Sequence, residues 1–94
     1  MEITVSELEK LSPDSYILYD TRSETEKMYG IMEGAVSLSA DELLSAPPED
    51  KTKKLIVCCA RGKFSVDTAE RLSEMGYDAC SLSGGYAAWL LALM

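Results

Sequence analysis

Short apolar runs separated by polar, turn-forming segments recur along the whole chain. Residues 16–20 (YILYD), 55–58 (LIVC) and 79–82 (ACSL) are β-prone runs of strand length. The run at 55–58 is continuously apolar, which is typical of a central parallel strand covered on both faces. Residues 3–5 and 35–38 are predicted to be shorter extended segments. The pattern therefore predicts a small sheet with a buried central strand.

Short helices are predicted between these runs, because three serines are each followed three positions later by a glutamate. Such pairs form capping boxes, in which each residue binds the backbone N–H of the other. The predicted boxes are Ser6 with Glu9, Ser23 with Glu26, and Ser39 with Glu42. The first helix is expected to run through Leu11, the second to stop at Gly30, and the third to end before Pro47 and Pro48.

A longer helix is predicted over residues 65–75, where apolar residues recur at helical spacing and Gly76 supplies the stop. The members of this stripe are Val66, Ala69, Leu72 and Met75. Gly84 and Gly85 then turn the chain into a last helix over residues 86–93.

This alternation predicts an α/β fold with a small, mostly parallel β-sheet flanked by helices on both faces. Residues 1–94 are expected to form one domain, because the chain can bury a single modest core but not two. In such sheets, sites form at the carboxyl ends of strands. We therefore expect Asp20 and the loop of residues 59–64 (CARGKF) to lie at the same edge, where a reaction would take place.

The formal charge of −7 argues against nucleic-acid binding, because phosphate contacts need clustered Lys and Arg. On so acidic a chain, the cationic pair Arg61 and Lys63 predicts a small anionic ligand. No run approaches the roughly 18 apolar residues of a membrane span, and the first residues are acidic where a secretory signal would be basic. We expect a cytoplasmic protein with no membrane partner and three reduced thiols.

The loop itself raises a chemical question, because Cys59 lies in a chain that has no histidine to act as its base. A loop of six residues with Gly62 near its middle can curl so that the amides of residues 60–64 point inward as an anion-binding nest. The next helix presents the positive end of its dipole to the same place. Together with Arg61 and Lys63 these groups favour a thiolate, which needs no base to be a nucleophile.

Other cysteine chemistries fit the spacing less well. Cysteine-dependent phosphatases have an arginine six positions after the cysteine, but here the sixth residue after Cys59 is Ser65 and after Cys58 is Phe64. A redox motif of the thioredoxin type needs two residues between its cysteines. A zinc site needs four ligands, which three cysteines without histidine do not supply. We therefore expect neither a metal nor another cofactor.

Three segments resemble single-domain rhodaneses, and the resemblance covers nearly the whole chain. YDTRSETEKMYGIMEGAVSLS is similar to the amino-terminal motif of that family, LIVCCARGKFS to its active-site strand and loop, and LSGGYAAW to its carboxyl-terminal signature. The matching positions are Asp20, Arg22, Gly30, Gly34, Ala35, Cys59, Gly62, Ser65, Gly84, Gly85 and Trp89. The chain departs from the family at Ile31 and Glu33, within a structural turn, and at Phe64, where a basic residue is common.

The resemblance implies a sulfurtransferase. Cys59 would take the outer sulfur of a donor such as thiosulfate, release sulfite, and pass the sulfur from a persulfide to a thiol or protein acceptor. The cradle for the donor and the persulfide would comprise Ala60, Arg61, Gly62, Lys63, Phe64 and Ser65. Two other functions remain open: a non-enzymatic sulfur-carrier or protein-interaction module of the same fold, and a thiol redox sensor.

The remaining candidates have structural interpretations. Cys58 is expected to point into the core, as is Cys80, although Cys80 would be available to resolve an oxidised Cys59. Asp20 and Arg22 are interpreted as an ion pair that holds the active loop. We expect Ser65 to cap the following helix and, as a second role, to form a hydrogen bond to the sulfur. Gly84 and Gly85 are expected to form a backbone turn. Trp89 is expected to lie in the core or in a partner-binding patch.

Overall fold

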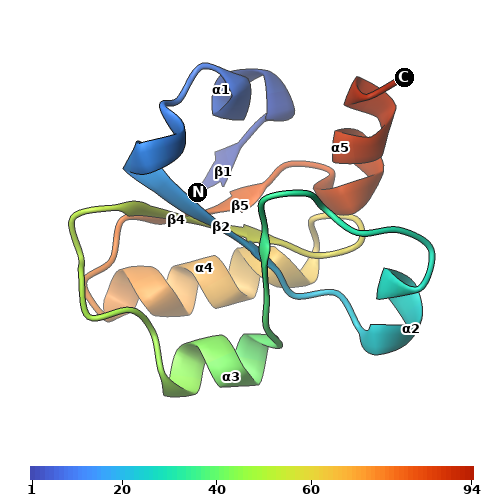
Figure 1. The fold of residues 1–94 in the computed structure, drawn as a ribbon. Coiled ribbons are helices and arrows are strands. Elements are labelled where there is room, and N and C mark those ends of the chain that lie inside the picture. The colour runs from blue at the N-terminus through green and yellow to red at the C-terminus, as the bar shows by residue number, and fades with distance from the viewer.

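A five-stranded, fully parallel sheet forms the centre of the protein, whose computed structural model describes residues 1–94 (Figure 1). The strands lie in the order β1-β5-β4-β2-β3. Their bounds are β1 Glu2–Ile3, β2 Tyr16–Asp20, β3 Val36–Ser37, β4 Lys54–Cys58 and β5 Ala79–Leu82. The predicted parallel α/β fold is confirmed, with β4 at its centre.

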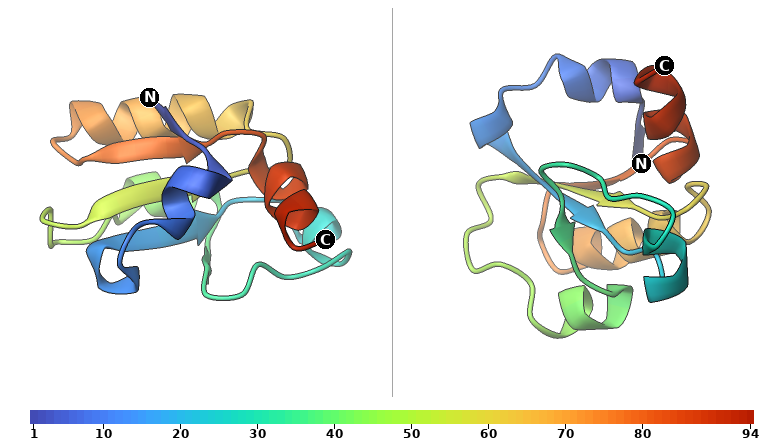
Figure 2. Two further views of the ribbon diagram at one scale, coloured as in Figure 1. Left: turned by 90° about the horizontal axis from the view of Figure 1, so that it is seen from above. Right: turned by 45° about the vertical axis from the view of Figure 1, so that its right-hand side comes forward.

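Helices cover both faces of this sheet. The helical segments are α1 Val5–Glu9, the 3₁₀ turn η1 Pro13–Ser15, α2 Glu24–Lys27, α3 Ala40–Ser45, α4 Phe64–Glu74 and α5 Gly85–Ala92. α1 and α5 lie on one face and α3 and α4 on the other, while α2 lies beyond the carboxyl end of β2 (Figures 1 and 2). None of these helices is both long and apolar enough to cross a membrane.

The core has two halves, which explains why β4 is apolar without interruption. Ile56 and Cys58 face the cluster covered by α1 and α5, whereas Leu55 and Val57 face the cluster that contains Leu72 of α4. These five side chains are completely buried. Alternate residues of a strand point to opposite faces, so a strand buried on both faces needs apolar residues at every position.

Element boundaries differ from the predictions by one to two residues, with one clear error. The capping boxes of Ser23 and Ser39 are present, but the first box pairs Thr4, not Ser6, with Glu7, and the helix ends at Glu9. Both pairs have the same spacing in the sequence. β1 determines the choice: it ends at Ile3, and Thr4 is the first residue after it in extended conformation.

The sheet order places a crevice at the carboxyl ends of β2 and β4. From β2 the chain moves to β3 on one side, and then returns to β4 and β5 on the other. Asp20 and Cys58, the last residues of the two strands, are partners in the register. Ligand sites of open parallel sheets form where successive connections diverge in this way.

Candidate functional site

The sulfur of Cys59 lies at this divergence point, at the start of the loop between β4 and α4. Cys59 is only 5% exposed. Its Sγ accepts hydrogen bonds from the backbone N–H of Gly62 at 3.1 Å and of Ser65 at 3.4 Å, and it lies 3.3 Å from the Ser65 hydroxyl. The curled loop expected from the sequence is therefore present, and its donors converge on the thiol.

The sulfur also occupies the place of a helix cap. The N-cap residue of α4 is Lys63, whose side chain makes no capping hydrogen bond. The expectation that Ser65 caps the helix is wrong, because Ser65 lies inside the first turn. Its free N–H points to Cys59 instead, so the sulfur satisfies an amide that a helix start would otherwise leave unpaired. The donor set therefore extends beyond the expected amides of residues 60–64.

The environment of Cys59 favours its anion. Burial raises the pKa of the thiol, but hydrogen bonds from the Ser65 hydroxyl and from the backbone amides of Ser65, Arg61 and Phe64 outweigh burial. The pKa of Cys59 is therefore lower than its ordinary value. Hydrogen bonds to a charged sulfur achieve what a neighbouring histidine does in other thiol sites.

The other two cysteines have the opposite environment. Cys58 is fully buried and Cys80 is 2% exposed, both in the cluster beneath α1 and α5. Burial raises the pKa of Cys58 to about 12, with a contribution from the charge of Asp20. Burial also raises the pKa of Cys80. Their burial in this cluster confirms the core placement expected for Cys58 and Cys80. All three cysteines are free of disulfide bonds.

The first turn of α5 forms backbone hydrogen bonds with the loop that begins at Cys59. The N–H of Tyr86 donates to the Cys59 carbonyl at 2.8 Å, and the N–H of Ala87 donates to the Ala60 carbonyl at 3.1 Å. This contact requires Gly85, because a Cβ there would lie 2.2 Å from the Cys59 oxygen and 2.6 Å from the Gly62 nitrogen. The glycine pair is thus a turn, as expected, and also a close contact with the active loop.

Thr21 contributes a contact that the sequence interpretation missed. Its backbone N–H and its hydroxyl both donate to the Cys58 carbonyl, at 2.8 and 2.9 Å. The backbone on the amino-terminal side of the thiol is thereby fixed to the end of β2. The sequence offers one indication of this contact: Thr21 lies between Asp20 and Arg22, at the end of a predicted strand.

Asp20 and Arg22 form a buried, two-pronged ion pair. Arg22 Nη2 and Nε donate to the two carboxylate oxygens of Asp20 at 2.8 and 2.9 Å. Nη2 also donates to the Gly30 carbonyl, and the guanidinium lies 3.7 Å from the centre of the Tyr86 ring. The pair therefore joins β2, the turn at Gly30 and α5. Tyr86 links the pair to the loop, because its N–H donates to the Cys59 carbonyl. Neither Asp20 nor Arg22 hydrogen bonds to the sulfur.

An open cleft of about 610 Å³ leads to the thiol. Its walls come from the end of β2, from α2, from the start of α3 and from the active loop. The lining residues are Thr21, Arg22, Ser23, Glu26, Ser39, Ala40, Cys59, Ala60, Arg61, Lys63, Phe64 and Thr68. Arg61 and Lys63 are exposed in this lining, and Phe64 is 78% exposed at its edge. The cleft thus has two exposed cations in its lining, Arg61 and Lys63, besides the buried Arg22, and a shielded sulfur.

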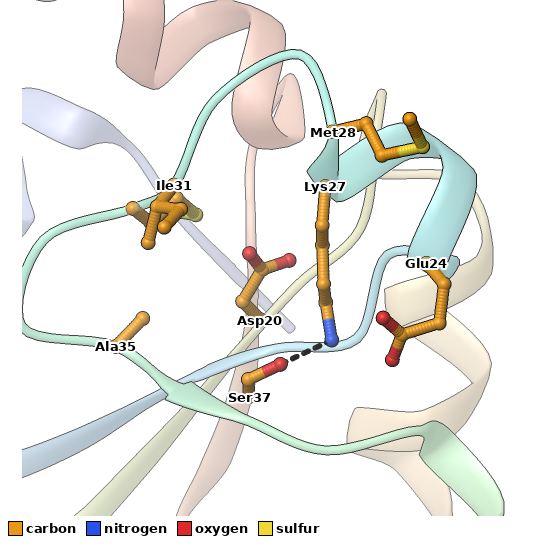
Figure 3. Close-up of a pocket in the computed structure, with 8 residues that line it drawn as sticks. Asp20, Glu24, Lys27, Met28, Ile31, Ala35 and Ser37 are labelled. Carbon is orange, nitrogen blue, oxygen red and sulfur yellow. Dashed lines mark hydrogen bonds between the residues drawn. The ribbon is translucent and has the colours of Figure 1, made fainter.

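A second, smaller pocket of about 270 Å³ contains no cysteine. Figure 3 shows Asp20 between Ile31 and Lys27, with the Lys27 ammonium donating to the Ser37 hydroxyl. Asp20, which is paired with Arg22, and Lys27 thus have partners within the protein. Nowhere does the protein bring three or more His, Cys, Asp or Glu side chains together as a metal site would require. The reactive group that remains is the Cys59 thiol.

Comparison with known proteins gives consistent results. A family model described as "Rhodanese-like domain" matches residues 4–92. The rhodanese-related protein of Thermoplasma volcanium is 25% identical, with a TM-score of 0.82 over 97% of this chain and 91% of that protein. A human single-domain sulfurtransferase is 25% identical, with a TM-score of 0.82 over 96% and 95% of the two chains. A rhodanese-like domain protein from Staphylococcus aureus is 27% identical, with a TM-score of 0.80 over 94% and 89%.

No curated protein sequence matches the chain. The family model nevertheless covers all three segments on which the sequence resemblance rests, and the solved structures share the sheet and its helices. The resemblance to single-domain rhodaneses is therefore confirmed, and the chain belongs to the family of rhodanese-like domains.

Proposed function

We propose that the protein is a sulfurtransferase that carries a sulfane sulfur on Cys59. Membership of the family supports this function in general terms, as does the similar fold of the human sulfurtransferase. One observation carries the assignment to this residue: the Cys59 sulfur receives backbone hydrogen bonds from Gly62 and Ser65 and lines an open cleft.

The first step is attack of the Cys59 thiolate on the outer sulfur of thiosulfate. A bond forms between the two sulfurs, the sulfur–sulfur bond of thiosulfate breaks, and sulfite leaves with its electron pair. Cys59 then carries a persulfide whose outer sulfur is anionic. The inward-facing amides of the loop would hold that charge, in the manner of an oxyanion hole.

The second step is attack of an acceptor on the outer sulfur. An acceptor thiolate or cyanide forms a bond to that sulfur, the bond to Cys59 breaks, and Cys59 leaves as the thiolate. The same hydrogen bonds stabilise this leaving group. The donors that lower the pKa of Cys59 thus assist both halves of the cycle, first as activators and then as stabilisers of the departing anion.

An anionic donor is favoured by the charges at the cleft. Arg61 and Lys63 line it on a protein whose formal net charge is −7. A local positive potential on an acidic surface raises the concentration of a small anion at one place. We therefore propose thiosulfate or an anionic persulfide as donor, and a thiol or a protein thiol as acceptor.

A redox sensor is a poorer interpretation of the same site. Such a sensor needs a second thiol that forms a disulfide with the oxidised cysteine. Cys58 is fully buried with a pKa raised to about 12, and Cys80 is buried with a raised pKa, so neither is ready to attack as a thiolate.

We propose that the protein works in the cytoplasm, where free thiols persist.

The test is a thiosulfate-to-cyanide sulfur transfer assay on wild type, Cys59→Ser and Cys58→Ser. We expect Cys59→Ser to remove activity to the background level. Cys58→Ser is the matched control, because it changes the neighbouring cysteine on the other side of the sheet. It should keep activity within about threefold if the protein remains folded.

Equal activity in all three proteins would overturn the assignment to Cys59. Absence of transfer by wild-type protein, with thiosulfate and with a glutathione persulfide donor alike, would favour the non-enzymatic carrier or interaction module. A disulfide formed on mild peroxide treatment, seen in intact mass, would favour the sensor.

A further inference from the structure

Two buried serine hydroxyls lie behind the Cys59 sulfur. Ser65 in the first turn of α4 and Ser81 in the middle of β5 are both 0% exposed. Their Oγ atoms are 2.5 Å apart, and Ser65 Oγ is 3.3 Å from Cys59 Sγ. The three side chains thus form a continuous chain of hydrogen-bonding groups that runs from the strand to the thiol.

Packing gives no reason for a hydroxyl at Ser81. Residues of β5 alternate between the two faces: Cys80 and Leu82 belong to the cluster under α1 and α5, and Ala79 belongs to the cluster under α4. Ser81 faces α4 as Ala79 does, where an alanine would fit an apolar wall. A buried hydroxyl lowers stability unless it forms a hydrogen bond, so its single bond to Ser65 requires an explanation.

Counting hydrogens fixes the direction of this chain. A serine hydroxyl has one hydrogen to donate. Ser65 Oγ is the partner that the structure gives to Ser81 Oγ, and it lies 3.3 Å from Cys59 Sγ, in a contact where a protonated Cys59 is the donor. A Cys59 thiolate has no proton to donate, so Ser81 then donates to Ser65 and the Ser65 hydrogen is left for the sulfur. Both hydrogens then have acceptors and the sulfur needs no proton. With a neutral thiol, three hydrogens would share these two contacts. Ser65 Oγ can accept from both Cys59 and Ser81, but one hydroxyl hydrogen would then lack an acceptor within the chain of three groups.

We propose that Ser81 is a positioning residue for the reactive thiol, which it influences through Ser65. By donating to Ser65 Oγ, Ser81 orients the Ser65 hydrogen toward the Cys59 sulfur and polarises that bond. Hydrogen bonds in a chain strengthen one another by about 10–30% each. The relay therefore favours the thiolate over the thiol. This inference concerns the cysteine of the proposed function, but it is a statement about ionisation and not about sulfur transfer.

The experiment measures the rate of Cys59 alkylation by iodoacetamide against pH, which gives the pKa of the thiol without any sulfur donor. The variants are Ser81→Ala, Ser65→Ala, the double variant, and Ser83→Ala as control. Ser83 is a half-buried serine just beyond β5 whose hydroxyl donates to the Glu2 carboxylate, away from Cys59. Thermal unfolding of each variant is recorded in parallel.

Ser81→Ala is expected to raise the alkylation midpoint by about half a pH unit, which lowers the rate about threefold well below the midpoint. Ser65→Ala is expected to raise it by about one unit or more. Ser83→Ala should leave the midpoint unchanged. In the Ser65→Ala background, adding Ser81→Ala should cause no further shift, because Ser81 acts through Ser65.

Ser81→Ala should unfold at the same temperature as wild type or higher. An unchanged midpoint would overturn the inference. An equal shift in both backgrounds would also overturn it, and so would a sharp loss of stability, which would identify the hydroxyl as structural. A protein with the expected midpoints but no sulfur transfer would contradict the proposed function and not the relay.

Discussion

At the scale of single residues, two neighbouring cysteines have opposite properties because they end a strand and begin a loop. Cys58 is the last residue of β4 and points into an apolar cluster, where burial raises its pKa to about 12. Cys59 is one residue further, where the loop turns and its amides face the sulfur, so its pKa is lowered. A single step along the chain thus separates a thiol with a raised pKa from a thiol with a lowered pKa.

Selective alkylation follows from this difference. At neutral pH, iodoacetamide should modify Cys59 of the folded protein at least about tenfold faster than Cys58 or Cys80, because the thiolate is the reactive form. Peptide mapping by mass spectrometry after timed quenching measures the three rates. In denaturant the three rates should become equal. Faster labelling of Cys58 in the folded state would contradict the site described above.

The position of Cys59 could be predicted from the sequence, whereas the roles of the hydroxyls could not. An apolar run ending at Cys58 and a glycine three residues after Cys59 suffice to predict a strand followed by a curled loop. The bonds of Ser65 and Ser81 depend on how α4 packs against β5. Residues far apart in sequence meet there, and no local pattern encodes their contact.

At the scale of elements, the active loop is held between three neighbours. An amide in the first turn of α4 donates to the Cys59 sulfur, and two amides of α5 donate to carbonyls of the loop. Thr21, which follows β2, donates to the carbonyl of Cys58. No disulfide fixes the loop. Its shape therefore depends on backbone contacts with these neighbours, and among the glycines Gly85 leaves the least room for a Cβ.

Gly85→Ala should disrupt the loop. The added Cβ would meet the Cys59 carbonyl at 2.2 Å, and the backbone has a φ of +57° that side chains disfavour. We expect loss of at least about 2 kcal/mol of unfolding free energy and a fall in sulfur transfer. Chemical denaturation and the cyanide assay provide the two measurements.

Gly34→Ala is the matched control. Its φ is +84°, but nothing lies within 4 Å of the added Cβ. It should cost about 1–2 kcal/mol through backbone strain alone and leave activity per folded molecule unchanged. Equal effects of the two substitutions on activity would show that the contact between α5 and the loop has no functional role.

Helices and strands could be predicted from the sequence where the residues that determine them are close together in the chain. The strand at 79–82 and two of the three capping boxes match the structure, because apolar runs and box spacing act over a few residues. The first box was misplaced since both Thr4 and Ser6 have a glutamate three positions later. β1 determines which of them is used, and its pairing with β5 is a long-range contact.

At the scale of the whole molecule, a net charge of −7 surrounds a cleft that displays Arg61 and Lys63. An acidic surface repels small anions on average, so these two side chains have to produce the local attraction. Exposed charges are screened by salt over about 10 Å at moderate ionic strength. The attraction should therefore depend strongly on salt.

Removing the two cations should weaken donor binding more than turnover. The double variant Arg61→Ala, Lys63→Ala is expected to raise KM for thiosulfate about tenfold and to change kcat by less than about threefold. Added salt should raise KM of wild type and have little effect on the variant. Steady-state kinetics at several salt concentrations measure both. Lys10→Ala with Lys53→Ala is the control, because it removes the same charge outside the cleft.

If the control raised KM as much as the loop variant, only the net charge would matter, and the assignment of Arg61 and Lys63 to donor recruitment would be wrong.

The Asp20–Arg22 pair makes stability sensitive to acid. Burial raises the pKa of Asp20, but the hydrogen bonds and charge of Arg22 outweigh it and bring the pKa below the ordinary 3.8. The stabilisation that ionised Asp20 gives to the folded protein is therefore complete above the pKa of Asp20 in the unfolded chain. It is lost as the pH falls through the lower pKa of Asp20 in the folded protein. Asp20→Asn should cost about 3 kcal/mol at neutral pH and flatten this acid dependence.

Urea unfolding at a series of pH values measures the effect. Asp67→Asn is the control, because it breaks an exposed ion pair with Arg71 and should cost less than about 1 kcal/mol. Similar losses for both variants would contradict a special role of the buried pair.

The most direct test of the central claim is the intact mass of the protein after incubation with thiosulfate and removal of the excess. If the loop amides stabilise a sulfur anion on Cys59, wild type should gain one sulfur, about 32 Da, that reducing agent removes and that peptide mapping assigns to Cys59. Cys58→Ser should gain it and Cys59→Ser should not. An unchanged wild-type mass, or a sulfur carried by Cys58 or Cys80, would contradict the account.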